Sequence, residues 1–292
     1  MSEPLGILTR FGTLSQTEQE VVDLACFGAD SSANHKLCFN SDFPVGAGIL
    51  AANDAGETKL FTGANVENQW FPPTVCAERT AATRAAFEGF KQFRVVSVFC
   101  RKHPGGSPCG LCRQVLVQFG RDSLLLNIVD RERTVRKALV GDLLPAAGGA
   151  SVSFAQLSLE EQKLVRRVNA IKKRSHVPYS KRPRAALFVC ENAKGRKRVF
   201  EGVSDDNASY GGSALAETVA MRTARTAGFH RNVNLIVTVD DTSTVNPVEG
   251  ECLQVLREFG AEAPILLVGP DRSVVRSCLT ELLPDSFGPE AL

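Results

Sequence analysis

The sequence has no long apolar run and no strong excess of either charge. No stretch approaches the roughly 20 consecutive apolar residues that cross a bilayer, so we expect no membrane span. Residues 1–13 carry no apolar run behind a basic start, which argues against a secretory signal. The net charge of +2 gives no reason to expect a nucleic-acid or membrane partner. These absences favour a cytoplasmic protein, with nuclear or organellar residence also open.

The number of cysteines indicates the redox compartment of the protein, and its length indicates the number of domains. The chain has nine cysteines, and an odd number without a secretory signal fits a reducing compartment better than a disulfide framework. At 292 residues it is about twice the typical domain length of roughly 150 residues. We therefore expect two packed domains and cysteines with roles other than cross-linking.

The two halves of the chain repeat one another at a nearly constant offset. The matches run in the same order through both halves: Phe61-Thr62-Gly63 with Phe200-Glu201-Gly202, Asn68 with Asn207, Ala77-Glu78 with Ala216-Glu217, Cys112 with Cys252, Gln114-Val115-Leu116 with Gln254-Val255-Leu256, and Leu143-Leu144-Pro145 with Leu282-Leu283-Pro284. Such ordered matches indicate a tandem duplication. We predict domains at residues 1–148 and 149–292, with a linker in 145–158.

Each half alternates the patterns of helices and strands. In the first half we predict helices at 17–29, 76–89 and 109–120, and strands at 45–51, 59–65, 94–101 and 124–129. A helix at 158–174 matches the opening helix in the second half. The alternation predicts an α/β fold of three layers, α/β/α, with a mixed sheet flanked by helices and the whole domain duplicated in tandem.

Two short motifs carry candidate metal ligands. Cys76-Ala77-Glu78 opens one predicted helix, and Pro108-Cys109-Gly110-Leu111-Cys112 opens another, which matches the known signature of zinc-dependent deaminases. Cys109 and Cys112 are three residues apart, so on a helix both can reach one ion. Three protein ligands leave the fourth tetrahedral position for water, as in catalytic zinc sites. We predict a zinc site made by Cys76, Cys109 and Cys112.

Glu78 is the candidate proton carrier of this site. Lying two residues beyond a ligand, it can reach a bound water and pass protons to a base nitrogen and to leaving ammonia. Three thiolates on a dication leave a net negative charge that a nearby cation should offset. We expect Arg79 and Arg113, which follow Glu78 and Cys112, to donate hydrogen bonds to the sulfurs.

The chain resembles the cytidine deaminases of pyrimidine salvage over nearly all of its length. Four motifs in family order carry the resemblance: Ser41 to Ala47, Gly63-Ala64-Asn65-Val66-Glu67-Asn68, Cys76 to Ala81, and Ser107 to Gln114. It implies zinc-dependent hydrolytic deamination of cytidine and deoxycytidine to uridine and deoxyuridine. It further implies that Asn65 and Glu67 hold the ribose hydroxyls, that Phe43 packs against the pyrimidine, and that the backbone around Ala77 reads the base edge.

The second half lacks most of these residues. The replacements are Leu215 for Cys76, Glu249 for Cys109, Leu253 for Arg113, Ser204 for Asn65, Asp206 for Glu67 and Arg182 for Phe43. We therefore expect one Zn²⁺ per chain, held in the N-terminal domain, and a degenerate second domain without catalytic zinc.

The resemblance also implies an assembly. Family members with one active and one degenerate domain form dimers, so we expect a homodimer with four domains and two zinc sites. By the same resemblance, Tyr210 and Phe287 of the degenerate domain are expected to complete the active pocket, either in their own chain or in the partner.

Two other functions compete with this interpretation. A deaminase of polynucleotides or nucleotides would need a basic groove bearing aromatic residues, or a phosphate site, beside the zinc motifs. The sequence shows neither there. An interaction module stabilised by structural zinc would explain the cysteines but not Glu78 or the open coordination position.

Overall fold

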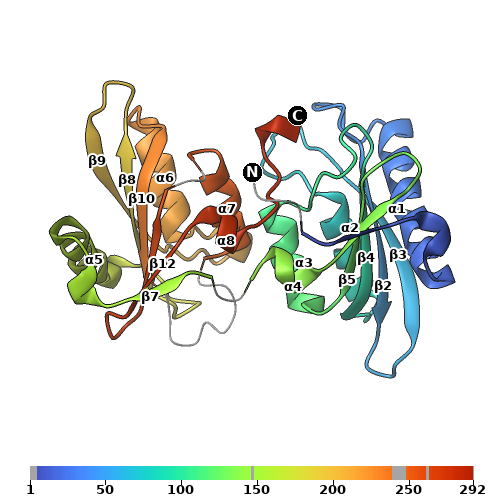
Figure 1. The fold of residues 1–292 in the computed structure, drawn as a ribbon, viewed down its shortest axis with the longest axis horizontal. Coiled ribbons are helices and arrows are strands. Elements are labelled where there is room, and N and C mark those ends of the chain that lie inside the picture. The colour runs from blue at the N-terminus through green and yellow to red at the C-terminus, as the bar shows by residue number, and fades with distance from the viewer. Residues whose placement is uncertain (1–4, 146–147, 239–247, 261–262, 292) are drawn as a thin grey trace. The chain divides into compact units, whose positions relative to one another are not determined.

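The chain folds into two compact units (Figure 1). The structure, a computed structural model, describes residues 5–145, 148–238, 248–260 and 263–291. The first unit comprises Met1–Leu144 together with Pro284–Leu292, and the second comprises Pro145–Leu283. We predicted that the C-terminal segment 284–292 would belong to the second domain, whereas it belongs to the first unit.

A six-stranded mixed sheet forms the centre of the first unit. Across the sheet the strands are β1 (Ile7–Thr9), β6 (Val135–Leu139), β5 (Leu124–Ile128), β4 (Gln92–Cys100), β2 (Val45–Ala52) and β3 (Thr58–Ala64). Only β4 and β5 run parallel to each other among these neighbours. The helix α3 (Gly110–Gly120) connects this parallel pair, because parallel strands need a crossover.

Helices cover both faces of this sheet. The helix α1 (Gln16–Asn34) packs on β2, β3 and β4, and its first turn is closed by a capping box between Ser15 and Glu18. The helices α2 (Ala77–Phe87) and α3 pack on the opposite face, with α4 (Val140–Leu143) against α3 (Figure 1). The unit is therefore a three-layer α/β/α domain.

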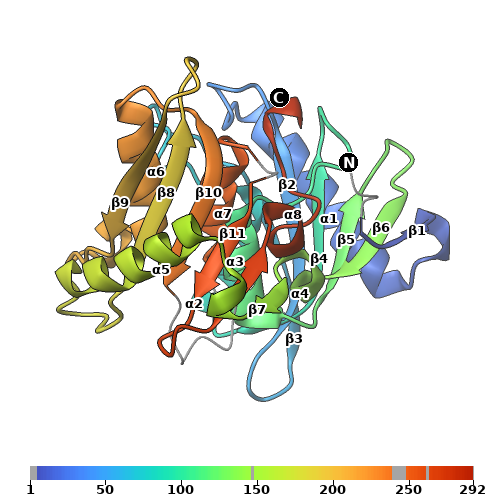
Figure 2. The same ribbon diagram turned by 60° about the vertical axis from the view of Figure 1, so that its left-hand side comes forward.

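The second unit repeats this design strand for strand. Its sheet order is β7 (Ala150–Val152), β12 (Val274–Ser277), β11 (Ile265–Val268), β10 (Arg231–Thr238), β8 (Ala185–Glu191) and β9 (Lys197–Val203), with β10 and β11 parallel. The helices are α5 (Leu159–Ile171), α6 (Ala216–Thr226), α7 (Gly250–Arg257) and α8 (Leu279–Leu282). Figure 2 shows α5 lying across its own sheet. The predicted tandem α/β fold is confirmed.

The predicted linker differs from the structure. Residues 145–158 contain the edge strand β7 and a 3-10 helix at Phe154–Gln156, and β7 pairs with β12 more than 120 positions later in the chain. The first unit has a matching edge strand, β1, followed by a 3-10 helix at Phe11–Thr13. Short edge strands gain their conformation from a distant partner, so local composition did not reveal them.

One glycine in each unit brings a helix close to the sheet. A Cβ on Gly63 of β3 would lie 2.3 Å from the carbonyl oxygen of Ala77, and a Cβ on Gly202 of β9 would lie 2.0 Å from that of Ala216. Only glycine permits this approach. It holds the start of α2, where Cys76 and Glu78 lie, directly against the edge strand β3.

No helix within the described part of the chain is long and apolar enough to cross a membrane. Further 3-10 turns lie at Lys172–Arg174, Tyr210–Gly212 and Pro289–Ala291.

Candidate metal centre and pocket

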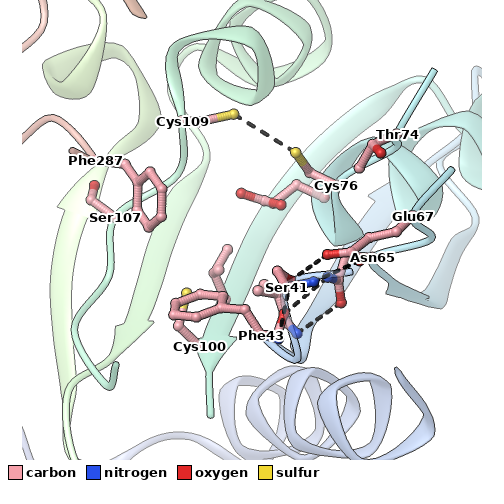
Figure 3. A pocket seen from close by; sticks show the side chains of 13 residues that line it. Ser41, Phe43, Asn65, Glu67, Thr74, Cys76, Cys100, Ser107, Cys109 and Phe287 are labelled. Atoms are coloured by element: carbon pink, nitrogen blue, oxygen red, sulfur yellow. Dashed lines mark hydrogen bonds between the residues drawn. The ribbon is translucent and has the colours of Figure 1, made fainter. Parts of the chain in front are cut away.

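Three cysteines of the first unit converge at the starts of α2 and α3. Cys76 and Cys109 are the residues immediately before these helices, and Cys112 lies in the first turn of α3. The Sγ atoms of Cys76 and Cys109 are 3.8 Å apart (Figure 3), and those of Cys109 and Cys112 are 3.4 Å apart. All three sulfurs lie within 4.8 Å of one another, and none of the nine cysteines forms a disulfide.

The sulfur separations fit a zinc ion. Tetrahedral coordination with zinc–sulfur bonds of about 2.3 Å places two sulfur ligands about 3.8 Å apart. Contact among the three thiols lowers the pKa of Cys109 well below its ordinary value and raises those of Cys112 and Cys76, the latter to about 11, so Cys109 ionises first. Three thiol groups in contact, at two helix N-termini that favour thiolate, are the donor set that zinc prefers. Cys76, Cys109 and Cys112 would therefore hold the ion.

Glu78 lies beside the cysteines and is almost fully buried. Its exposed fraction is 3%, and it lines the same cavity as Cys76 and Cys109. Burial, together with the neighbouring Cys76, raises the pKa of Glu78 to about 7. A buried carboxyl group in the wall of the cavity can exchange protons with a bound molecule, because bulk water does not reach the carboxyl group to exchange protons in its place.

Arg79 contacts the sulfur cluster. Its Nη2 atom donates to the carbonyl oxygen of Thr74 at 2.8 Å and lies 3.8 Å from Cys76 Sγ. The strong bond to Thr74 holds the guanidinium in place, so the positive charge stays next to a sulfur ligand. This is the position that we predicted from the sequence.

Arg113 was predicted to donate to the sulfurs, and this prediction is wrong. The side chain is 1% exposed, and its five N–H groups are used elsewhere. They bond to Pro108 O at 2.7 Å, Leu143 O at 2.6 Å, Ser107 Oγ at 3.0 Å, Asp285 O at 2.6 Å and Pro284 O. Burial lowers the pKa of Arg113 to about 10, which still leaves it charged at neutral pH. Arg113 therefore holds the C-terminal segment 284–292 against α3.

The metal centre forms one end of a cavity of about 230 Å³ in the first unit. The side chains that line the cavity come from the loop before β2 and the first residue of β2, from β4, from the segment between β3 and α2 and the first turn of α2, from the segment just before α3 and from the C-terminal segment. They are Ser41, Phe43, Val45, Asn65, Glu67, Thr74, Cys76, Glu78, Val98, Cys100, Ser107, Cys109 and Phe287 (Figure 3).

The predicted ribose-binding residues line this cavity and also hold the loop before β2. Asn65 Oδ1 accepts from Ser32 Oγ at 2.7 Å and from the Val45 N–H at 2.9 Å, while Asn65 Nδ2 donates to Phe43 O at 3.0 Å. Glu67 accepts from the N–H groups of residues 40 and 41 and from the Ser41 hydroxyl. The two polar side chains are thereby fixed at one wall.

Two phenylalanine rings meet over the cavity. The ring centroids of Phe43 and Phe287 are 6.2 Å apart, with an angle of 72° between the planes, which is an edge-to-face pair. Phe287 lies in the C-terminal segment that belongs to the first unit of the same chain. The cavity of a single chain thus contains both rings.

Tyr210 and Ala77 are not among the residues that line the cavity. Tyr210 belongs to the second unit, is 77% exposed and packs beside Tyr179 at 6.4 Å between ring centroids. Ala77 is fully buried as the first residue of α2, with its carbonyl group against Gly63. The proposed roles of both residues stay predictions.

Sequence reasoning missed Cys100 and the loop serine Ser41 as lining residues. Cys100 was interpreted as an ordinary buried cysteine. It lies two residues beyond Val98 at the end of β4, so the alternation of a strand places both side chains on the cavity side. That alternation was the available signal.

Comparison with known proteins gives consistent matches. A family model described as the zinc-binding region of cytidine and deoxycytidylate deaminases matches residues 17–127 and 159–268, one segment in each unit. The probable cytidine deaminase of Dictyostelium discoideum is 34% identical over 145 residues, which cover 49% of this chain and 95% of that protein. The cytidine deaminase of Sporosarcina psychrophila is 36% identical over 107 residues, covering 37% of this chain and 76% of that protein.

A solved structure is also similar to part of the chain. The crystal structure of cytidine deaminase from Burkholderia pseudomallei shares 30% sequence identity with a TM-score of 0.38, over 46% of this chain and 99% of that chain.

Proposed function

The chain belongs to the cytidine and deoxycytidylate deaminase family, and we propose that it deaminates cytidine and deoxycytidine in pyrimidine salvage. The reaction adds water at C4 of the base and releases ammonia, giving uridine or deoxyuridine. The observation that carries the proposal is the convergence of three cysteines and one buried glutamate in the wall of a single cavity.

The residues of the cavity have two different roles in the reaction: three bind the metal ion, and one transfers protons. Zinc, when bound by Cys76, Cys109 and Cys112, supplies a Lewis acid that makes water a nucleophile at neutral pH. The Glu78 carboxylate takes one proton from the attacking oxygen and delivers it to N3 of the base. It then takes the second proton from the same oxygen and delivers it to the amino group, which leaves as ammonia while C4 keeps the oxygen as a carbonyl group. Burial excludes bulk water from these transfers.

The other walls would hold the nucleoside. Asn65 and Glu67 are proposed to bind the ribose hydroxyls, for which the remaining Nδ2 proton of Asn65 and the lone pairs of the Glu67 carboxylate are available. Phe43 and Phe287 are proposed to pack against the pyrimidine ring. The cavity volume of about 230 Å³ suits a base with part of its sugar.

One assay tests the function. Purified zinc-loaded protein is given cytidine, deoxycytidine, cytidine monophosphate, deoxycytidine monophosphate and single-stranded DNA, and the loss of the cytosine absorbance band is followed. We expect turnover of the two nucleosides. Turnover confined to the monophosphates or to DNA would replace this proposal with a nucleotide or polynucleotide deaminase.

Arg79 should stabilise the thiolate ligands. Removing a group that hydrogen-bonds to a metal ligand typically costs about 10–100-fold in metal affinity or activity. We expect Arg79→Ala to bind zinc about tenfold more weakly or to turn over at least tenfold more slowly, as measured by competition with a chelator and by kcat. Arg84→Ala removes an exposed arginine of the same helix and should leave both unchanged. Wild-type values in Arg79→Ala would contradict the proposed role.

Phe287 should contribute mainly to substrate binding. An aromatic contact is worth about 0.5–1.5 kcal/mol, so we expect Phe287→Ala to raise KM about twofold to twelvefold with little change in kcat. Phe87→Ala, at a ring that is 90% exposed, is the matched control. Unchanged KM in Phe287→Ala would show that its ring only packs against Phe43.

The homodimer with two active sites and the cytoplasmic location stay predictions. Tyr210 remains a candidate for completing the pocket of a partner chain in such a dimer.

A further inference from the structure

The second unit has a buried acidic cluster at the place that corresponds to the metal centre. Glu217 lies in the first turn of α6, Glu249 immediately precedes α7, and Cys252 lies in the first turn of α7. They correspond to Glu78, Cys109 and Cys112 of the first unit. A carboxylate oxygen of each glutamate and the Cys252 sulfur all lie within 4.8 Å of one another.

A guanidinium group bridges the two glutamates of this cluster. Arg184 Nη2 donates to Glu217 Oε1 at 2.6 Å, and Arg184 Nη1 forms an ion pair with Glu249 Oε1. The Arg184 side chain is 12% exposed and the Glu217 side chain is fully buried. The planar guanidinium therefore bridges the starts of two helices, as the metal would between α2 and α3.

The backbone shows that Arg184 corresponds to Val45, a lining residue of the first cavity. The Val45 N–H donates to Asn65 Oδ1 and the Arg184 N–H donates to Ser204 Oγ, both at 2.9 Å. In return, the N–H groups of Asn65 and Ser204 donate to the carbonyl groups of Val45 and Arg184, both at 3.1 Å. An arginine at this position extends into the volume where the first unit has its cavity.

The carboxylates of the cluster outnumber the cation that pairs with them. Two carboxylates around one guanidinium leave one net negative charge. Within the described part of the chain, Glu217 Oε2 and Glu249 Oε2 are buried without a hydrogen-bond partner. Such atoms are costly in a protein interior, and a metal ion would pair both.

We propose that Arg184 takes the place of the metal ion in the second unit. Glu217, Glu249 and Cys252 then form a potential site for a divalent cation that the Arg184 side chain blocks. Two carboxylates and one thiol match the mixed ligand preference of zinc and cobalt. The guanidinium excludes the ion by occupying its position and neutralising its ligands. The second unit thereby keeps the helix starts joined without any metal.

The test replaces Arg184 by the residue of the corresponding position, as Arg184→Val. Wild-type and variant are equilibrated with excess zinc, freed of unbound metal and analysed for metal per chain. We expect the variant to gain one equivalent over the wild-type, whatever the first unit holds. With cobalt, the gained ion should add a thiolate charge-transfer absorption from Cys252.

Matched variants separate the site from general effects. Arg184→Val/Glu249→Gln lacks one ligand and should lose the gain, while Arg231→Val removes a largely exposed arginine of the same unit and should show none. If Arg184→Val folds only when zinc is present, as followed by circular dichroism, that result also supports the proposal.

Three results would overturn the proposal. One is a folded Arg184→Val protein that gains no metal. Another is a wild-type protein in which the second cluster already binds an ion, detected as metal lost on Glu249→Gln substitution. The third concerns an Arg184→Val protein that does not fold with or without zinc. The triple variant Arg184→Val/Glu217→Gln/Glu249→Gln also removes the two carboxylate charges, so it should fold if those charges are what Arg184 neutralises. Failure of the triple variant to fold would overturn the proposal.

Discussion

Glu78→Gln is expected to lower kcat by about 10²–10⁴-fold while the protein keeps its zinc and its fold. A positioned general acid–base group contributes about this factor, which corresponds to roughly 3–5 kcal/mol of transition-state stabilisation. Glutamine has the same shape as glutamate and fills the same buried space, but it cannot carry the protons that the reaction moves. The side chain is 3% exposed, so bulk water cannot easily replace it.

Kinetics and metal analysis together check this expectation. The Glu78→Gln variant should bind a cytidine analogue with nearly unchanged affinity, and its zinc content should equal that of the wild-type. Glu88→Gln, at the other end of α2, where the side chain pairs with Lys59, serves as the control with normal turnover. A Glu78→Gln variant that retained more than a tenth of the wild-type kcat would rule out Glu78 as the proton carrier.

Arg113→Ala is expected to destabilise the first unit by about 3–5 kcal/mol and to release the C-terminal segment. The substitution leaves the carbonyl groups that Arg113 now bonds without donors in a buried region, and each such group costs about 1–3 kcal/mol. Arg113→Lys should restore little, because an ammonium group has three donors where the guanidinium uses five. Released from Arg113, Phe287 would no longer be held against Phe43.

Three measurements test this role of Arg113. The urea midpoint should fall, limited proteolysis should cut near residue 284, and KM should rise as in Phe287→Ala. In the double variant Arg113→Ala/Phe287→Ala, the two effects on KM should not add, because both act through the same ring. Arg121→Ala, which removes one bond at 3.2 Å to Leu144 O, should cost only about 1 kcal/mol. An intact segment with unchanged KM in Arg113→Ala would contradict the positioning role.

The positions of the zinc ligands and Glu78 illustrate what local sequence can determine. Cys76 and Glu78 are two residues apart, Cys109 and Cys112 are three apart, and both pairs open a helix. Local structure at the two helix starts sets the placement within each pair, because Cys76 and Cys109 immediately precede α2 and α3 while Glu78 and Cys112 lie in their first turns. The meeting of the two pairs needs the fold, and the sequence predicted it only through the family signature.

The duplication and the three-layer fold were also accessible from the sequence, because matched motifs and alternating periodicities extend over whole halves. The edge strands β1 and β7 were not accessible in this way. Each has three residues and takes its conformation from pairing with a strand more than 120 positions away, so no local pattern reports it.

The sequence by itself thus determined the chemistry of the metal centre, the tandem α/β fold and the loss of two of the three cysteine ligands in the second half. Only the tertiary structure decided which partners Arg113 and Arg184 have. Arg113 bonds to carbonyl groups 171 and 172 positions away, and Arg184 reaches Glu249 65 positions away. A long cationic side chain carries no sequence signal for its partner, because that partner depends on which distant backbone or carboxylate the fold brings within reach.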